Sequence, residues 1–400
     1  METLDLAEEG YLHREKLNRK KISLINLISF FIGFSQAFFI YILSNYLKLS
    51  FGRENVGIFY LIAYLITLIL LLNLYKFVKK FGKSDIFHFS LLYKIIITAF
   101  LLVVSPGPFA IVLVVLYIIF GSLEMVSLDM ILESHSNDKM SGRIRGKFLT
   151  ILNAGFLIGP FLSTWILGKY DYNGVFLFLL IFNLFISGLA VWGIKKTDHQ
   201  FDVDLKVRDI IKKIKIRKNV GRIFYVSFIL EFFYAMMIIH TPLYPINIGL
   251  SWGDIGIIFT VMLIPFVILQ YPLGVLADKK TGEKEFIIFA VILMGLSTGV
   301  IYFIGGKSIL VWSMILFFTR IGAAIIEILR DSYFYKKIDG YDVDLIGIFR
   351  TAMPLGYIAA SGISIILLLI FPLKFIFFLV GLIVFSALWP AIKLADSECE

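Results

Sequence analysis

Twelve long runs of apolar residues constrain the fold of this chain more than any other feature. A helix of ~20 residues crosses the ~30 Å hydrocarbon layer of a membrane, and each run has about 18 or more residues with few or no charges. With 59% hydrophobic and 17% charged residues, the 400-residue chain has more apolar surface than one water-soluble core could bury. We therefore expect an all-α membrane protein whose twelve transmembrane helices lie near residues 22–47, 55–75, 85–104, 107–131, 147–168, 173–194, 223–246, 255–277, 286–305, 308–331, 346–371 and 374–392.

Lysine and arginine are distributed unevenly between the loops that join these runs. Of the 38, 29 lie in the two termini and in every second loop, 5 lie in the other loops and 4 lie within the runs. Positive charge collects in cytoplasmic loops. We therefore expect a multi-pass protein of the plasma or inner membrane with both termini in the cytoplasm. The net charge of +9 fits attraction to anionic membrane lipids, so no nucleic-acid partner is expected.

The beginning of the chain and its reactive residues exclude several other classes. The first run follows "HREKLNRKK" and lacks a small-residue cleavage site, so it predicts a retained helix. The single cysteine, Cys399, allows neither a disulfide framework nor a cysteine metal cluster, and the five histidines are scattered. No G-x-x-x-x-G-K-[ST] loop for ATP is present. We expect no cofactor, no metal and no enzymatic activity.

The longest polar segment, residues 195–222, carries ten basic residues and separates six runs from six. Within it, Val203, Val207, Ile210 and Ile214 recur at helical spacing. This pattern predicts an amphipathic helix on the cytoplasmic membrane face, with a solvated linker as the alternative. The predicted organisation is a cytoplasmic tail at 1–21, a six-helix bundle at 22–194, the basic linker at 195–222, a second six-helix bundle at 223–392 and a tail at 393–400.

The two halves also resemble each other at an offset of about 200 residues. "GKFLTILNAG" at 146–155 aligns with "GIFRTAMPLG" at 347–356, with Gly, Phe, Thr and Gly in register. "VGIF" at 56–59 aligns with "IGII" at 255–258, and "KKFGK" at 79–83 with "KKTGEK" at 279–284. The common order of the three matches predicts two pseudo-symmetric bundles.

The segment "GVLADKKTGEK" between the eighth and ninth runs resembles the loop signature of the major facilitator superfamily, G-x-x-x-D-[RK]-x-x-G-x-[RK]. The signature positions are occupied by Gly274, Asp278, Lys279, Gly282 and Lys284. The resemblance implies the twelve-helix major facilitator fold and a latch that holds the cytoplasmic side in one conformation. A generic cytoplasmic turn is the alternative reading.

The corresponding segment of the first half, "LYKFVKKFGKS", departs from the signature. Leu74 stands where Gly is expected and Val78 where Asp is expected. A latch on that side would depend on Lys79, Lys80 and Gly82, so we expect the two latches to differ in strength.

A second resemblance lies in "GFLIGPF", residues 155–161. It is similar to the G-x-x-x-G-P element of the proton-coupled antiporter branches of the same superfamily. Gly155 and Gly159 share one helix face, and Pro160 leaves a carbonyl unpaired and bends the helix. Helix packing alone would explain the same spacing, and both readings stay open.

Charges at the middle of a membrane helix are functional candidates, because each costs roughly 2.5–3.5 kcal/mol on insertion scales. Glu231 lies near the midplane of the seventh run, and the family resemblance places this helix at the central cavity. Loss of water favours the protonated form of a carboxylic acid, as proton coupling requires. The alternative is a structural ion pair between Glu231 and Arg320.

The fourth and tenth runs carry further charges toward their cytoplasmic ends. The offset places Asp129 opposite Arg330, which suggests an ion pair that closes the cytoplasmic side. The plainer reading pairs the end-of-helix acids Glu133 and Asp331 with Arg143 or with the lysines of the latch loop. Further candidates for the cavity or for coupling are Glu124, Glu327, Gln36 and His240, the last also as a hydrogen-bonded interface residue.

Together these features predict a secondary active transporter that works by alternating access. We expect it to transport a small organic solute and to use protons as the coupling ion. We expect efflux of drugs or amphiphiles. We also expect the protein to act as a monomer among membrane lipids. Alternatives are a sugar, metabolite or lipid carrier of the same fold, or a sensor or scaffold that no longer transports.

Overall fold

The structure is a computed structural model, and it describes residues 19–134, 141–194, 217–278, 282–337 and 343–395. Every regular element in these ranges is helical, as the apolar runs predict. The expected amphipathic helix at residues 203–214 lies outside the described residues and stays a prediction.

The first half is built from α2 (Arg19–Phe51), α3 (Gly57–Leu72), α4 (Leu74–Phe81), α5 (Lys83–Val103), α6 (Pro108–Glu133) and α7 (Ser141–Gly193). The predicted run at 55–75 is interrupted at Asn73, where α3 gives way to the short α4. α7 contains two of the predicted runs. They meet at Asp171, whose positive φ of 53° is not helical and marks the turn between them.

The second half contains α9 (Lys218–His240), α10 (Leu243–Asn247), α11 (Trp252–Asp278), α12 (Glu283–Val300) with the 3-10 turn η2 (Ile301–Phe303), α13 (Ile309–Lys336), α14 (Val343–Ile370), α15 (Phe375–Phe385) and α16 (Leu388–Ile392). By length and apolar composition, ten helices in the described part of the chain are able to span a membrane, and α7 supplies two crossings. The shorter α3 coincides with another predicted run.

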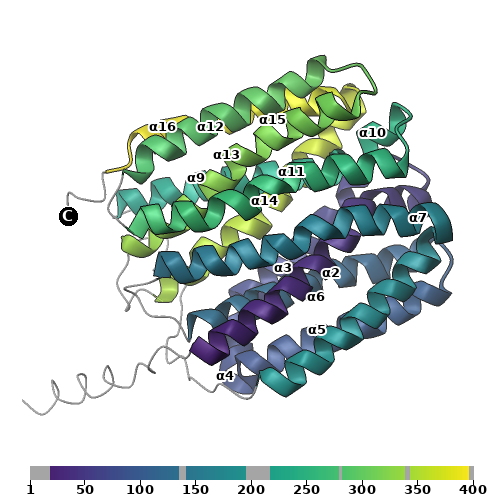
Figure 1. Cartoon of the computed structure of the whole chain (residues 1–400). Coiled ribbons are helices and arrows are strands. Elements are labelled where there is room, and N and C mark those ends of the chain that lie inside the picture. The colour runs from purple at the N-terminus through teal and green to yellow at the C-terminus, as the bar shows by residue number, and fades with distance from the viewer. Residues whose placement is uncertain (1–18, 135–140, 195–216, 279–281, 338–342, 396–400) are drawn as a thin grey trace, which may run out of the picture.

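The helices form two groups that lie side by side (Figure 1). The purple to teal helices, α2 to α7, make the N-terminal half, and the green to yellow helices, α9 to α16, make the C-terminal half. The halves meet where α7 packs along α11 and where α3 packs along α14. Large apolar side chains on the outside of the bundle, among them Trp192 and Leu369, are exposed, which suits contact with lipid.

The internal repeat is visible in the packing of individual residues. Gly155 on α7 lies against the backbone of Phe30 on α2, and Gly356 on α14 lies against Glu231 on α9. Gly356 and Glu231 each come 201 residues after their counterparts. The two halves therefore use the same helix contact, with Phe30 at the place that Glu231 occupies in the second half.

The bundle has two ends. We call the end at which α2 begins and α16 finishes the terminus end, and the end at which α2 finishes, at Phe51, the loop end.

Candidate functional site

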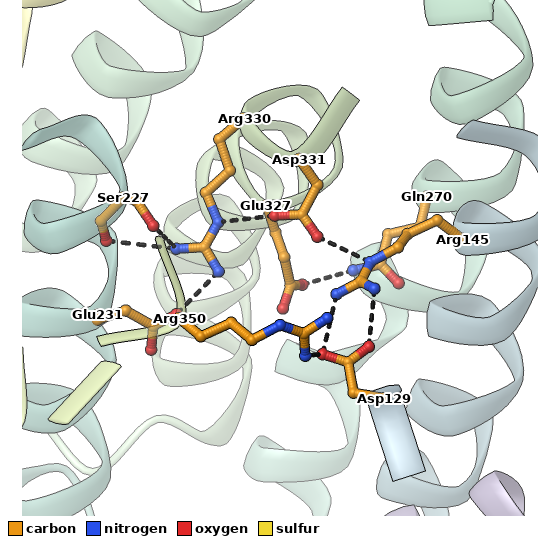
Figure 2. Close-up of polar contacts among 9 residues, drawn as sticks. All are labelled: Asp129, Arg145, Ser227, Glu231, Gln270, Glu327, Arg330, Asp331 and Arg350. Atoms are coloured by element: carbon orange, nitrogen blue, oxygen red, sulfur yellow. Dashed lines mark hydrogen bonds and ion pairs between the residues drawn. The ribbon is translucent and has the colours of Figure 1, made fainter. Parts of the chain in front are cut away.

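Ion pairs join the two halves near the terminus end (Figure 2). Arg145, at the start of α7, places Nε 2.9 Å from Oδ2 of Asp331 on α13. Its Nη1 lies 2.7 Å from Oδ1 of Asp129 on α6. Arg350 on α14 also contacts the carboxylate of Asp129. Two contacts between the halves, Arg145 to Asp331 and Arg350 to Asp129, are therefore ion pairs.

Arg330, next to Asp331 on α13, pairs within the C-terminal half (Figure 2). Its Nη2 donates to Oε1 of Glu231 at 2.8 Å, and its Nη1 donates to Oγ of Ser227 at 2.7 Å. Its Nε is 3.5 Å from Oδ1 of Asp331. Arg330 is thus held to α9 and does not reach Asp129.

Three pairings expected from the sequence are corrected by these contacts. Asp129 pairs with Arg145 and Arg350, so the expected pair with Arg330 is wrong. Glu231 pairs with Arg330 and not with Arg320.

Asp331 faces Arg145 and Arg330, where pairing with Arg143 or the loop lysines was expected. Arg143 itself is exposed at the start of α7. The side chain of Glu133 lies outside the described residues.

A chain of neutral amides also crosses between the halves. Asn153 on α7 donates from Nδ2 to Oε1 of Gln270 on α11 at 2.9 Å. Gln270 donates from Nε2 to Oε2 of Glu327 on α13 at 2.5 Å (Figure 2). Glu327 is thereby linked to the N-terminal half through an amide.

We call these ten residues the interface network: Asp129, Arg145, Asn153, Ser227, Glu231, Gln270, Glu327, Arg330, Asp331 and Arg350. It contains four carboxylates and three guanidinium groups. Asp129, Glu231 and Asp331 each contact a guanidinium. Among the described residues, Glu327 contacts none and accepts its hydrogen bond from Gln270. Within the interface network, Glu327 is therefore the carboxylate without a guanidinium partner.

The latch signature between α11 and α12 is described only in part. Gly274 lies near Gly146 of α7, whose missing side chain allows close approach: a methyl group there would be 3.6 Å from Cα of Gly274 and 3.2 Å from the carbonyl of Gln270. Gly282 is exposed before α12, and Lys284 is half-buried in its first turn. The side chain of Asp278 and all of Lys279 lie outside the described residues, so the latch remains a prediction.

A lysine ties three helix ends together beside this loop. Nζ of Lys336, at the end of α13, donates to Oε1 of the buried Glu283 at 2.6 Å and to the carbonyl of Ala277 at 2.5 Å. The first turn of α12 is thereby fastened to the last turns of α11 and α13.

In the N-terminal half, the two residues that depart from the signature are buried. Leu74 and Val78 pack inward from α4, whereas Lys79 and Lys80 are exposed. Gly82 has a φ of 83°, which glycine adopts without strain, and connects α4 to α5. This segment is built as an amphipathic helix with an apolar buried side.

Glu124 lies away from the interface network. Its Oε2 is 2.5 Å from Nζ of Lys94 on α5, and both side chains are fully buried. Lys94 also lies 5.1 Å from the ring centre of Tyr117. The pair connects α5 to α6 inside the N-terminal half, and the candidate role of Glu124 in coupling stays a prediction.

The GFLIGPF element packs α7 against α2. A methyl group at Gly159 would lie 2.6 Å from Cβ of Ala37, and one at Gly155 would overlap the carbonyl oxygen of Phe30. Pro160 lies inside α7, and its carbonyl accepts hydrogen bonds from the hydroxyls of Ser163 and Thr164. Close packing accounts for both glycines, and the antiporter reading stays a prediction.

Three remaining candidates lie outside the interface network. Gln36 on α2 is half-buried. His240 at the end of α9 is fully buried, and neither ring nitrogen has a hydrogen-bond partner among the described residues, so the expected interface hydrogen bond is not formed there. Arg320 on α13 is buried against the rings of Phe233 and Tyr234.

The halves also touch at the loop end. Nζ of Lys48 donates to Glu54 at 2.9 Å and to Oδ1 of Asn247 at 3.1 Å. Nδ2 of Asn247 donates to Glu54 at 3.0 Å, and Asn45 donates to the carbonyl of Pro242 at 3.2 Å. Among the described residues, polar contacts therefore join the halves at both ends, and the charged contacts near the terminus end are more buried than that of Lys48 with Glu54 at the loop end.

Two arginines of the interface network were not singled out from the sequence. Arg145 was counted among loop charges, and Arg350 among charges within runs. Their position in the repeat was the signal that could have found them. Arg350 lies within the repeated segment "GIFRTAMPLG", and Arg145 directly precedes the repeated segment "GKFLTILNAG".

Comparison with known proteins identifies the architecture. A family model described as Major Facilitator Superfamily matches residues 25–338. Among solved structures, the human organic anion transporter MFSD10 (TETRAN) superposes with a TM-score of 0.70, covering 94% of this chain and 100% of that one at 12% sequence identity. No curated protein sequence matches the chain. The chain therefore belongs to the major facilitator superfamily of secondary transporters and is a multi-pass, non-enzymatic membrane protein.

Proposed function

We propose that this transporter moves a small organic solute by alternating access and couples the movement to protons through Glu327. The observation that carries the proposal is the charge imbalance of the interface network, in which Glu327 is the carboxylate bonded to an amide instead of a guanidinium. Protonation of Glu327 leaves three carboxylates facing three guanidinium groups. A proton is thus accepted without leaving a cation unpaired.

The position of Glu327 gives this proton a mechanical consequence. Hydrogen bonds to an ionised acceptor are roughly twice as strong as neutral ones. Ionised Glu327 holds Gln270 firmly, and Gln270 in turn holds Asn153 of the other half. Protonation weakens this link, so it favours separation of the halves at the terminus end.

Glu231 is the less suitable proton carrier. Its carboxylate faces the guanidinium of Arg330 at 2.8 Å, and protonation would leave that buried cation with less compensation. We therefore assign Glu231 to positioning Arg330. This replaces the coupling role that its depth in the membrane suggested.

The topology and the direction of transport belong to the same proposal. The distribution of lysine and arginine supports a terminus end that faces the cytoplasm, in the plasma or inner membrane. The antiporter-like element at Gly155 supports solute export against proton entry, in a protein that acts as a monomer.

The human structural neighbour is described as an organic anion transporter. At 12% identity it supports the fold, and the solute of this chain has to be inferred from its own side chains.

The test uses a cysteine placed behind the network. Leu149 is buried one helical turn after Arg145, so Leu149→Cys in a Cys399→Ser background reports opening of the terminus end through its rate of maleimide labelling. In proteoliposomes, corrected for the intrinsic pH dependence of the reagent, labelling should accelerate as the pH falls. Glu327→Gln should label fast at every pH, and Glu285→Gln, an exposed acid outside the network, should behave as the parent.

The same vesicles test transport itself. A mixed library of organic compounds, assayed with an imposed pH gradient, should contain a solute whose flux depends on the gradient in the parent and no longer does so in Glu327→Gln. The proposal would be wrong if the labelling rate of the parent did not change with pH, or if the solute flux of Glu327→Gln still depended on the pH gradient.

A further inference from the structure

Arg320 is a buried cation that has no acidic partner among the described residues. It lies near the middle of α13 and is 2% exposed. No carboxylate or hydrogen-bond acceptor among the described residues contacts its guanidinium group, and its Nε is buried without a partner. A guanidinium has five N–H donors, so its hydrogen-bonding capacity is unused.

What surrounds Arg320 is aromatic. Its guanidinium carbon lies 5.2 Å from the ring centre of Phe233 and 5.8 Å from that of Tyr234, both on α9. The ring of Tyr234 lies 6.2 Å from that of Phe266 on α11, and its hydroxyl is buried with no hydrogen-bond partner in the described part of the chain. A residue whose ring packs on the guanidinium of Arg320 therefore carries a second buried polar group with unused hydrogen-bonding capacity.

The treatment of a second arginine argues against a purely structural role. A charge at the middle of a membrane helix is unfavourable, so buried arginines are normally paired with an acid or with hydrogen-bond acceptors. Aromatic rings attract the cation but accept none of its N–H donors as a carboxylate would. Ten residues along the same helix, Arg330 shows how this fold treats a structural arginine: Ser227, Glu231 and Asp331 all contact it.

The N-terminal half comes within electrostatic range of Arg320. The residue concerned is Tyr41 of α2, whose ring lies 5.2 Å from that of Phe259 on α11. Arg320 itself lies near the middle of its helix, at the depth where an alternating-access protein holds its solute.

We infer that Arg320 binds the anionic group of an organic solute whose aromatic or apolar body packs on Phe233 and Tyr234. The anion supplies the acceptors that the described residues do not offer, and the unbonded hydroxyl of Tyr234 is available for a further hydrogen bond. This inference rests on the proposed transport function and narrows its solute to organic anions.

The test is binding by the purified full-length protein to three probes of one ring system and different charge: 2-naphthoate, 2-naphthamide and 2-naphthamidine. At roughly ten times its Kd, 2-naphthoate should raise the unfolding temperature by about 2 °C or more, whereas the neutral and cationic probes should not. Arg320→Gln should weaken naphthoate binding at least tenfold by the same readout, since hydrogen bonds to charged groups contribute about 1.5–3 kcal/mol.

Two further variants separate binding from structure. Arg320→Lys keeps the charge and should retain part of the shift. Arg222→Gln removes a guanidinium that donates to the carbonyl of Lys393 outside the site, and it should bind naphthoate as the parent does. If all three probes shift the parent equally, if none does, or if Arg320→Gln binds naphthoate as well as the parent, the inference is wrong.

The assay is independent of proton coupling because it needs no gradient. If the protein binds naphthoate selectively but labelling at Leu149→Cys does not change with pH, the proton-coupled mechanism is wrong and the anion site stands. If labelling changes with pH but naphthoate is not bound selectively, the anion site is wrong and the proton-coupled mechanism stands.

Discussion

Nε of Arg145 on α7 lies 2.9 Å from Oδ2 of Asp331 on α13, and this pair joins the two halves of the transporter near the terminus end. Arg145 also binds Asp129, so one guanidinium connects three helices. We predict that Arg145→Gln opens this end. Maleimide labelling of Leu149→Cys should accelerate at least threefold, whereas Arg143→Gln, an exposed neighbour two residues earlier, should leave the rate unchanged. An equal rate in the parent and Arg145→Gln would show that the pair does not hold the end closed.

The pair between Glu231 and Arg330 should behave as a buried ion pair within one half. Their side chains are 12% and 10% exposed, and removing one partner of a buried pair costs about 3 kcal/mol or more. Glu231→Gln and Arg330→Gln should each lower the unfolding temperature. The double variant should lose less than the sum of the single losses, and strict additivity in this double-mutant cycle would contradict direct coupling.

We predict that the ion pair between Lys94 and Glu124 contributes to folding and not to transport. Both side chains are fully buried inside the N-terminal half and away from the interface network. We expect Lys94→Met alone to destabilise the protein, because it leaves Glu124 as an uncompensated buried acid. Lys94→Met combined with Glu124→Leu should recover folding and retain transport. Loss of transport in a well-folded double variant would return Glu124 to the list of coupling residues.

Close packing of α7 on α2 predicts a steep penalty at one glycine. A methyl group at Gly155 would overlap the carbonyl oxygen of Phe30, whereas one at Gly168, further along α7, would meet no atom within 4 Å. Gly155→Ala should therefore destabilise the protein by about 1–3 kcal/mol, as overpacking does. Gly168→Ala should be nearly neutral. Equal stability of the two variants by thermal unfolding would contradict the contact.

The helices could be predicted from the sequence because length and apolarity decide them. The runs required no knowledge of neighbours, and the repeat anticipated that Gly155 and Gly356 would take equivalent places. The turn at Asp171 lies in the short gap predicted between two runs.

The ion pairs could not be predicted in the same way. Successive residues of a helix turn by about 100°, so Arg143 and Arg145 face nearly opposite directions. Boundaries uncertain by two residues cannot decide which of them points between the halves. Equal depth suggested Arg320 as the partner of Glu231. Arg320 does face α9, but its guanidinium packs on the rings of Phe233 and Tyr234, whereas the guanidinium of Arg330 reaches the carboxylate of Glu231.

The pseudo-symmetry misled for a related reason. The offset correctly makes Asp129 and Arg330 equivalent positions, one in each half. Equivalent positions need not touch, and each of these residues found a partner on another helix: Asp129 binds Arg145 and Arg350, and Arg330 binds Glu231.

We predict that the two halves move as units about their shared interface, and that the charges of Arg145 and Arg350 hold the terminus end closed. Distances between paired spin labels in a Cys399→Ser background would report this motion. One pair, Lys147 on α7 and Glu285 on α12, spans the terminus end, and the other, Val103 on α5 and Leu310 on α13, spans the loop end; all four residues are exposed. With Arg145→Gln and Arg350→Gln together, the first distance should lengthen and the second should shorten. Two unchanged distances, or two that lengthen together, would contradict the account.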